Sequence, residues 1–287
     1  MRTDSSADAQ AGYHRTVFGG LQEWERALGV IEDFAEEPGV AGMLGLDQIS
    51  HFGPTGCDLI ADQLRRPVDL LVELGSGYGG ALRYLVDRLN RLGGGVRVAV
   101  GVDIVTGHCR VAQRITESLG LSGHLAVCAS AEAVPLRTGD ADAVVVSGSM
   151  PHFGRPGRVL SEAARLLRPS GQLVLTEEVS LLAAGREVSS AFRATHPADV
   201  FYLSAPEDRL RQCADAGFVD VRFRDLTEWA IKLFDERLKV IKIFRGTVER
   251  LFGATETAVI VETVLAARAE FERRVLVPAL ITARRPG

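Results

Sequence analysis

The chain has 287 residues, of which 46% are hydrophobic and 24% are charged, and its net charge is −4 at pH 7. This composition is that of an ordinary folded protein and excludes wholesale disorder. The negative net charge disfavours nucleic acid as a partner, because binding to phosphates needs a basic surface. A chain of this length buries a sizeable core without disulfides.

The cysteines are too far apart in the sequence for a close metal-binding spacing; they are Cys57, Cys109, Cys128 and Cys213. This pattern argues against a structural zinc site and against a disulfide scaffold, so no metal is expected. The N-terminus lacks the apolar segment of a signal peptide, and no uncharged apolar run is long enough to span a membrane. The sequence therefore predicts a cytoplasmic protein with reduced thiols and no membrane partner.

The first third of the chain begins with helical patterns. An amphipathic stretch at 21–36 predicts a helix that Pro38 ends, and a second short helix is predicted at 57–65. From Pro67 onward, short apolar segments alternate with helical ones. The predicted strands of this region lie at 68–74, 97–104, 124–130, 141–149 and 172–178. Nearly continuous apolar strands separated by helices indicate a parallel sheet that is covered on both faces.

The last third continues with a predicted helix at 205–218 and a strand at 219–226. Two long stretches with apolar stripes follow at 228–252 and 255–274, and a closing strand is predicted at 276–285. The apolar stripes of the two long stretches indicate either core packing or an interface.

A glycine-rich segment follows the first predicted strand. Gly75, Gly77 and Gly80 have the spacing G-x-G-x-x-G. Such a loop lets the backbone approach a nucleotide, and the following helix offers unpaired N–H groups. Asp103 ends the second predicted strand, where a carboxylate accepts hydrogen bonds from ribose hydroxyls. On spacing alone, this pattern fits NAD as well as an adenosyl cofactor.

The rest of the chain discriminates between these cofactors. Four segments, in order, resemble the motifs of class I S-adenosylmethionine-dependent methyltransferases: 73–85 (ELGSGYGGALRYL), 129–136 (ASAEAVPL), 140–153 (DADAVVVSGSMPHF) and 162–177 (EAARLLRPSGQLVLTE). Within that superfamily, the chain most resembles the small-molecule group, which includes sarcosine/dimethylglycine N-methyltransferases and tocopherol/prenyl C-methyltransferases. A nicotinamide dehydrogenase is disfavoured, because the chain also lacks a Tyr-x-x-x-Lys dyad.

The resemblance implies an α/β fold with a Rossmann-like, seven-stranded, mostly parallel sheet and an antiparallel last strand. Residues 1–66 would form an N-terminal helical cap. Residues 67–287 would form the methyltransferase core, with insertions at about 179–204 and 228–275, the second of them a helical lid. The expected boundaries follow the motifs that carry the resemblance.

The implied function is S-adenosylmethionine-dependent C-, O- or N-methylation of a small, apolar specialised metabolite, as in natural product biosynthesis. S-Adenosylhomocysteine would be the product, and the partner would be a small-molecule acceptor. The alternative is a protein that binds S-adenosylmethionine without transferring a methyl group, as a scaffold or a non-methylating catalyst. A homodimer through the long C-terminal helices or the N-terminal helix is compatible with the pattern, although no specific residue supports it.

The resemblance also assigns cofactor-binding residues by position. Gly75 and Gly77 would lie closest to the methionine part of the cofactor, with Glu73 near its amino group and Asp103 at its ribose. The remaining assigned residues would line the adenine or face the sulfonium: Ile104, Ser130, Ala131, Glu132 and Ser147. Ser130 stands where the family has an aspartate, so the resemblance implies a weaker contact there or one made by the backbone.

Three positions in the sequence offer candidates for catalysis. Glu177 and Glu178 end the fifth predicted strand, and strand alternation turns one of them toward the cleft. Glu177 is favoured because it aligns with a family aspartate, and it would accept a proton or stabilise a carbocation unless it is an ion-paired structural residue. His152 is either a general base or, as we prefer, a structural histidine. Tyr13, beside His14, would cap the reaction site unless this segment is disordered.

Basic residues of the segment 228–274 offer one more possibility. Lys232, Lys239, Lys242 and Arg245 would bind a diphosphate or a carboxylate if the acceptor carried one. Their spacing equally fits a solvated helix surface with ion pairs between residues four apart. The apolar character of the segment favours a lid that lines an apolar acceptor pocket.

Overall fold

The computed structural model describes residues 8–13, 47–48, 50–181 and 187–287. The helix predicted at 21–36 and His14 lie outside these residues. In the described part of the chain, no helix has the length and apolar character needed to cross a membrane.

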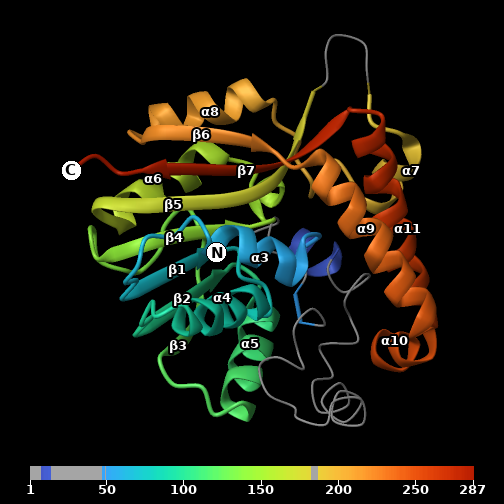
Figure 1. The fold of residues 1–287 in the computed structure, drawn as a ribbon, viewed down its shortest axis with the longest axis horizontal. Coiled ribbons are helices and arrows are strands. Elements are labelled where there is room, and N and C mark those ends of the chain that lie inside the picture. The colour runs from blue at the N-terminus through green and yellow to red at the C-terminus, as the bar shows by residue number, and fades with distance from the viewer. Residues whose placement is uncertain (1–7, 14–46, 49, 182–186) are drawn as a thin grey trace.

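A seven-stranded sheet forms the centre of the molecule (Figure 1). Its strands are β1 (Leu70–Leu74), β2 (Val98–Asp103), β3 (His124–Cys128), β4 (Ala141–Ser147), β5 (Leu167–Ser180), β6 (Val219–Asp225) and β7 (Leu276–Arg284). Their order in space is β3-β2-β1-β4-β5-β7-β6. The first five strands pair in parallel, whereas β7 runs antiparallel between β5 and β6. This arrangement confirms the predicted fold class.

Helices cover both faces of this sheet. The helices α3 (Gly53–Ala61) and α4 (Gly80–Arg91) share one apolar core with side chains such as Leu71 and Val145. The neighbouring residues of the same strands, Val72 and Val144, point into a second core that includes α6 (Pro156–Leu166) and residues of α8 (Pro206–Asp215). Because successive strand residues enter opposite cores, the strands are apolar along nearly their whole length. The helix α5 (Thr106–Ser118) contacts β2 and β3.

The strand β5 is longer than the sequence predicts. It runs from Leu167 to Ser180, because β7 pairs with it as far as Ser180 opposite Leu276. The helix before it, α6, ends at Leu166. Glu177 and Glu178, at the end of the predicted strand, therefore lie inside the observed one, paired with Ala279 and Pro278.

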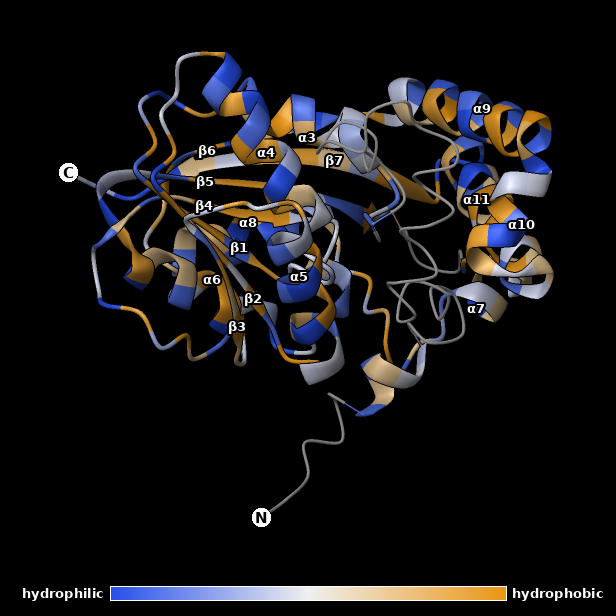
Figure 2. Cartoon of the chain, turned by 90° about the horizontal axis from the view of Figure 1, so that it is seen from below, coloured by the Kyte–Doolittle hydropathy of each residue, from blue (hydrophilic) through white to orange (hydrophobic). Residues whose placement is uncertain are grey.

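The two long stretches near the C-terminus form three helices beside the sheet (Figure 1). These are α9 (Thr227–Ile243), α10 (Arg245–Phe252) and α11 (Ala254–Glu272), so the chain breaks at Phe244 as well as at Gly253. With α7 (Ser190–Thr195), the helices α9 and α11 enclose a separate apolar core in which the ring centroids of Phe234 and Phe271 lie 5.4 Å apart. Apolar and polar residues alternate around α9 and α11 (Figure 2).

One residue near the start of β5 has an unusual backbone conformation. Ser170 has φ of 63°, a left-handed conformation that disfavours any residue with a side chain. We expect Ser170→Gly to raise the free energy of unfolding by about 1 kcal/mol in urea denaturation. The matched change Ser161→Gly, on the exposed side of α6, is expected to lower it by about 0.5–1 kcal/mol. A loss of stability in Ser170→Gly would contradict this interpretation.

Candidate functional site

A cavity of about 560 Å³ opens at the carboxyl ends of the parallel strands. Parallel α/β sheets bind their ligands at this edge. All nine residues predicted to bind the cofactor line the cavity: Glu73, Gly75, Gly77, Asp103, Ile104, Ser130, Ala131, Glu132 and Ser147. Tyr13 and His152 line it as well. The structure thus brings together residues that the sequence separates by more than a hundred positions.

The glycine loop needs its glycines for both conformation and space. Gly75 and Gly77 have φ of 73° and 54°, in the left-handed region. A Cβ atom on Gly75 would lie 2.5 Å from the side chain of Ser149. The hydroxyl of Ser149 in turn donates a hydrogen bond of 2.7 Å to the carbonyl of Leu74. The side chain of Ser149 thus occupies the space beside Gly75, and both glycines line the cavity.

Asp47 was not singled out by the sequence, yet it packs against the same loop. A Cβ atom on Gly80 would lie 2.6 Å from its Oδ1 atom. Asp47 forms a buried ion pair of 2.8 Å with Arg83 of α4, which also donates to the carbonyl of Tyr78. This pair holds the segment before α3 against the glycine loop, so the third glycine serves a protein contact.

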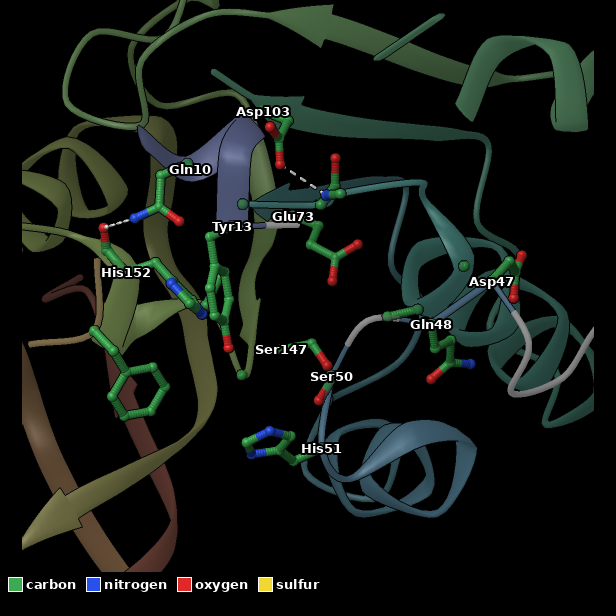
Figure 3. Close-up of a pocket in the computed structure, with 18 of the residues that line it drawn as sticks. Gln10, Tyr13, Asp47, Gln48, Ser50, His51, Glu73, Asp103, Ser147 and His152 are labelled. Atoms are coloured by element: carbon green, nitrogen blue, oxygen red, sulfur yellow. Dashed lines mark hydrogen bonds between the residues drawn. The ribbon is translucent and has the colours of Figure 1, made fainter. Parts of the chain in front are cut away.

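Asp103 is placed as a ribose ligand requires. One carboxylate oxygen accepts the N–H of Gly77 at 2.8 Å, and the other accepts the N–H of Val105 at 2.8 Å (Figure 3). The first of these oxygens, Oδ2, has no other hydrogen-bond partner among the described residues and keeps capacity for a hydroxyl group, whereas the second, Oδ1, also lies 3.3 Å from the Nδ1 atom of His108. The backbone contacts fix the orientation of the side chain at the cavity wall.

Glu73 is a buried carboxyl group that lines the cavity with one oxygen unpaired among the described residues. Its side chain is 1% exposed, and its Oε2 atom has no hydrogen-bond partner in the described structure. Burial raises the pKa of this carboxyl to about 8. Figure 3 shows the side chain between those of Tyr13 and Gln48. A buried acceptor without a partner fits a ligand that brings a cationic donor, as the amino group of an adenosylmethionine-type cofactor does.

The polar side chains of the segment that is predicted to line the adenine bind other groups of the protein. Ser130 accepts the N–H of Glu132 at 3.2 Å, which closes a short turn. The Glu132 carboxylate is paired with Arg155 at 2.8 Å. Ala131 is buried between them. These contacts engage the Ser130 hydroxyl and the Glu132 carboxylate within the protein, and the N–H of Ala133 donates to the Ser130 carbonyl at 3.0 Å.

The helix at 8–13 docks over the cavity. The amide nitrogen of Gln10 donates to the carbonyl oxygens of Val200 at 3.1 Å and His152 at 3.3 Å. The ring of Tyr13 extends into the cavity, with its centroid 5.8 Å from that of His152 (Figure 3). Burial, together with the negative charge of Glu178, raises the pKa of Tyr13 above its usual range. Its hydroxyl therefore stays protonated near neutral pH.

His152 has the contacts of a structural residue. Its Nδ1 atom lies 2.8 Å from the carbonyl oxygen of Val200, which can only accept, so Nδ1 carries the proton. Burial lowers the pKa of the ring to about 4. A ring with so low a pKa is a weak base, and the geometry favours the interpretation that His152 holds the loop and the N-terminal helix.

The prediction that Glu177 faces the cleft is wrong. Its carboxylate forms a bidentate ion pair with Arg209 of α8, at 2.7 and 2.9 Å, and both side chains are 1% exposed. Alternation along β5 turns Glu178 to the other face, where it lines the cavity. The side that each glutamate takes is fixed by the pairing of β5 with β7, which the sequence pattern did not reveal.

This burial makes Glu177 a structural residue. We expect Glu177→Gln to lower the free energy of unfolding by about 3 kcal/mol, because it leaves the Arg209 charge buried without a counterion. Urea denaturation measures the change. The matched surface variant Glu249→Gln, which breaks the pair with Arg245, is expected to cost less than about 1 kcal/mol. Equal effects of the two variants would argue against the buried ion pair.

Glu178 is joined to two histidines that the sequence did not assign. The Nδ1 atom of His51 lies 2.8 Å from its carboxylate, and the Nε2 atom of His51 lies 3.3 Å from the Nε2 atom of His196. His196 is fully buried and stacks on Phe192 at a centroid distance of 4.1 Å. Glu178 and His51 line the cavity, whereas His196 lies behind them.

The hydrogen bonds assign the protons of this chain of groups. Thr195 donates its hydroxyl proton to the carbonyl of Phe192, so the Nδ1–H of His196 donates to the Thr195 oxygen at 2.9 Å. Burial lowers the pKa of His196 to about 2, so the ring is neutral and its Nε2 atom is an acceptor. His51 therefore donates from Nε2 to His196, and its Nδ1 atom forms a hydrogen bond of 2.8 Å with the Glu178 carboxyl group. The second oxygen of Glu178 stays available to a ligand.

The basic residues expected to bind an anionic acceptor lie elsewhere. Lys232, Lys239, Lys242 and Arg245 are exposed, and none of them lines the cavity. The cavity is instead lined by Arg237 of α9, together with apolar side chains of the C-terminal helices. These apolar residues are Leu233, Val240, Ile241, Val248, Phe252, Ile260 and Val264.

Parts of this chain are similar in sequence to known methyltransferases. A family model described as a methyltransferase domain matches residues 72–175. The chain is 34% identical over 111 residues to dimethylglycine N-methyltransferase from Parasynechococcus marenigrum, a match that covers 38% of each chain. It is 26% identical over 178 residues to glycine/sarcosine/dimethylglycine N-methyltransferase from Actinopolyspora halophila, covering 61% of this chain and 30% of the relative. The matches thus span about a third of the length of these relatives.

Among solved structures, the fold resembles that of phosphoethanolamine N-methyltransferase 2 from Haemonchus contortus in complex with S-adenosyl-L-methionine. The TM-score is 0.73, the identity is 16%, and the match covers 90% of this chain and 60% of the other. At this identity, the likeness is one of fold. The matched domain, residues 72–175, contains the glycine loop, Asp103 and the strand β4.

Proposed function

We propose that this chain, which belongs to the class I methyltransferase superfamily, transfers a methyl group from S-adenosylmethionine to a small, largely apolar specialised metabolite. The observation that carries the proposal is the division of one cavity into two walls. The wall at the strand ends presents the glycine loop, Glu73 and Asp103. The opposite wall, from α9 to α11, presents aliphatic and aromatic side chains.

The polar wall fits the cofactor at three points. The unpartnered Oε2 atom of Glu73 would bind its ammonium group, and Asp103 would accept the ribose hydroxyls. Gly75 and Gly77 would lie against its methionine part, since both line the cavity and neither carries a side chain. When bound, S-adenosylmethionine supplies a methyl group already activated by the sulfonium charge, so the protein contributes mainly positioning.

Glu178 would handle the proton that methylation of an O–H, N–H or C–H group releases. Its free oxygen faces the cavity, while its other oxygen is held by His51 at 2.8 Å. As the new bond to the methyl group forms and the carbon–sulfur bond breaks, the acceptor's proton would pass to this carboxylate. Tyr13 and the helix at 8–13 would exclude water from above the reacting groups.

Calorimetric titration with S-adenosylmethionine, S-adenosylhomocysteine and NAD tests the proposal. We expect both sulfur compounds to bind with micromolar dissociation constants (about −8 kcal/mol) and NAD not to bind. Asp103→Ala is expected to weaken binding about tenfold or more, since it removes charge-assisted hydrogen bonds. The control Asp220→Ala changes an exposed carboxylate that pairs with Arg284 at the far end of β7.

The titration and an assay of methyl transfer together distinguish the possible outcomes. If the folded wild-type protein binds neither sulfur compound, the proposal fails. If it binds them but transfers no labelled methyl group to any acceptor in a broad metabolite screen, the alternative of a non-methylating, cofactor-binding protein gains support.

A further inference from the structure

Among the residues that the structure describes, the apolar wall of the cavity contains a single cationic side chain. Arg237 lies on α9 between apolar neighbours that also line the cavity, such as Leu233 and Val240. One of its guanidinium nitrogens donates to the carbonyl oxygen of His51 at 2.6 Å. The carbonyl belongs to the residue whose ring holds Glu178, so the guanidinium is anchored beside the proposed proton acceptor.

The backbone before α3 leaves room for this guanidinium. Gly53 has φ of 52°, and a Cβ atom there would lie 2.5 Å from the Nη2 atom of Arg237. A side chain at position 53 would therefore have to displace the guanidinium from its present place. The guanidinium retains further N–H donors, because the carbonyl uses one nitrogen of a group with five donors.

The charge of Arg237 has no counterion in the described structure. Glu236 also lines the cavity but forms no ion pair with it, and the same holds for Glu178, whose described ion-pair partner is His51. Burial alone lowers the pKa of Arg237 to about 10. At neutral pH the group is a cation in a largely apolar wall, an arrangement that favours an anionic ligand there.

We infer that Arg237 binds a carboxylate on the acceptor, which would therefore be an apolar molecule with one acidic group. This inference rests on the proposed function and narrows its substrate class. A guanidinium matches the planar carboxylate through two parallel hydrogen bonds. A diphosphate would bring more negative charge than one arginine offsets, and the exposed basic residues of α9 and α10 do not reach the cavity.

Matched small probes test the inference. The protein saturated with S-adenosylhomocysteine is titrated calorimetrically with hexanoate, 4-phenylbutyrate and phenyl phosphate, and with the primary amides of the two carboxylates. We expect each carboxylate to bind at least about tenfold more tightly than its amide, as a charge-assisted pair provides. Arg237→Gln should abolish this preference, and Arg237→Lys should retain part of it. Lys239→Gln, an equal charge change on the exposed side of α9, should leave it intact.

The outcomes are distinguishable. Equal binding of acid and amide by the wild-type protein would overturn the inference, as would a preference for the phosphate ester or a carboxylate preference that survives in Arg237→Gln. Arg237→Gln must still bind S-adenosylhomocysteine, which shows that it is folded; if it does not fold, Arg237→Lys and the wild-type comparison decide. If the wild-type protein does not bind S-adenosylhomocysteine, the proposed function fails, and the titrations without it still test Arg237.

Discussion

Glu178→Gln is expected to lower the rate of methyl transfer by about 100-fold or more, with little effect on the dissociation constant of the cofactor. The glutamine keeps the shape and the hydrogen bond to His51, but it cannot take a proton from the acceptor. Glu178 is the carboxylate for this role because its free oxygen faces the cavity, whereas Glu177 is bound by Arg209. The rate is measured with labelled donor on an acceptor found by screening.

Two further variants sharpen this test. Glu262→Gln neutralises an exposed carboxylate of α11 and should leave the rate unchanged. His196→Phe removes the acceptor of the His51 Nε2–H, so it should lower kcat and shift the pH profile while KM changes little. A Glu178→Gln enzyme that retains the wild-type rate would show that the acceptor loses its proton directly to water, and Glu178 would then have no role in proton transfer.

The features that the sequence predicted correctly depend on short segments of chain. The strand β1, the glycine loop and the start of α4 are contiguous, so their motif specifies both their structure and their place at the sheet edge. Asp103 follows from the same logic, because it ends the neighbouring strand. Glu73, Gly75, Gly77, Gly80 and Asp103 all line the cavity. Local pattern and topology together are therefore sufficient to place these residues around one cavity.

The part of the site that is proposed to bind the acceptor could not be predicted in the same way, because its residues come from segments that are distant in the sequence. Alternation offered Glu177 and Glu178 as equal candidates, and only the pairing of β5 with β7 decides which one faces the cavity. His51 and His196 are 145 positions apart and meet through packing of their rings. Arg237 was overlooked among the more numerous basic residues of this segment, since nothing in its spacing along the sequence shows that its side chain lines the cavity.

The affinity for S-adenosylmethionine is expected to rise about 100-fold between about pH 5.5 and 7.5, because of Glu73. Burial raises the pKa of this carboxyl to about 8 in the ligand-free protein, so it is protonated and neutral below that pH. The ammonium of the cofactor binds the ionised form. Binding must therefore expel one proton, and the affinity increases about tenfold for each unit of pH until Glu73 is already ionised.

The raised pKa of Glu73 also makes the stability of the ligand-free protein depend on pH. The folded-state pKa of Glu73 lies above its ordinary value of 4.5. The unfolded chain therefore releases its proton first, and the ligand-free fold loses stability as the pH rises from about 4.5 to 8. Bound cofactor offsets this loss, because its positive charge compensates the buried carboxylate. The pH range that weakens the ligand-free protein is thus the range in which the cofactor binds more tightly.

Calorimetry in two buffers with different ionisation enthalpies measures the proton directly. At about pH 7, the wild-type protein should release close to one proton for each cofactor bound, and Glu73→Gln should release almost none. Glu73→Gln should also bind more weakly at about pH 7.5 and show a flat affinity at lower pH. S-Adenosylhomocysteine carries the same ammonium and should follow the wild-type slope. Equal wild-type affinities at about pH 5.5 and 7.5 would mean that the ammonium does not bind at Glu73.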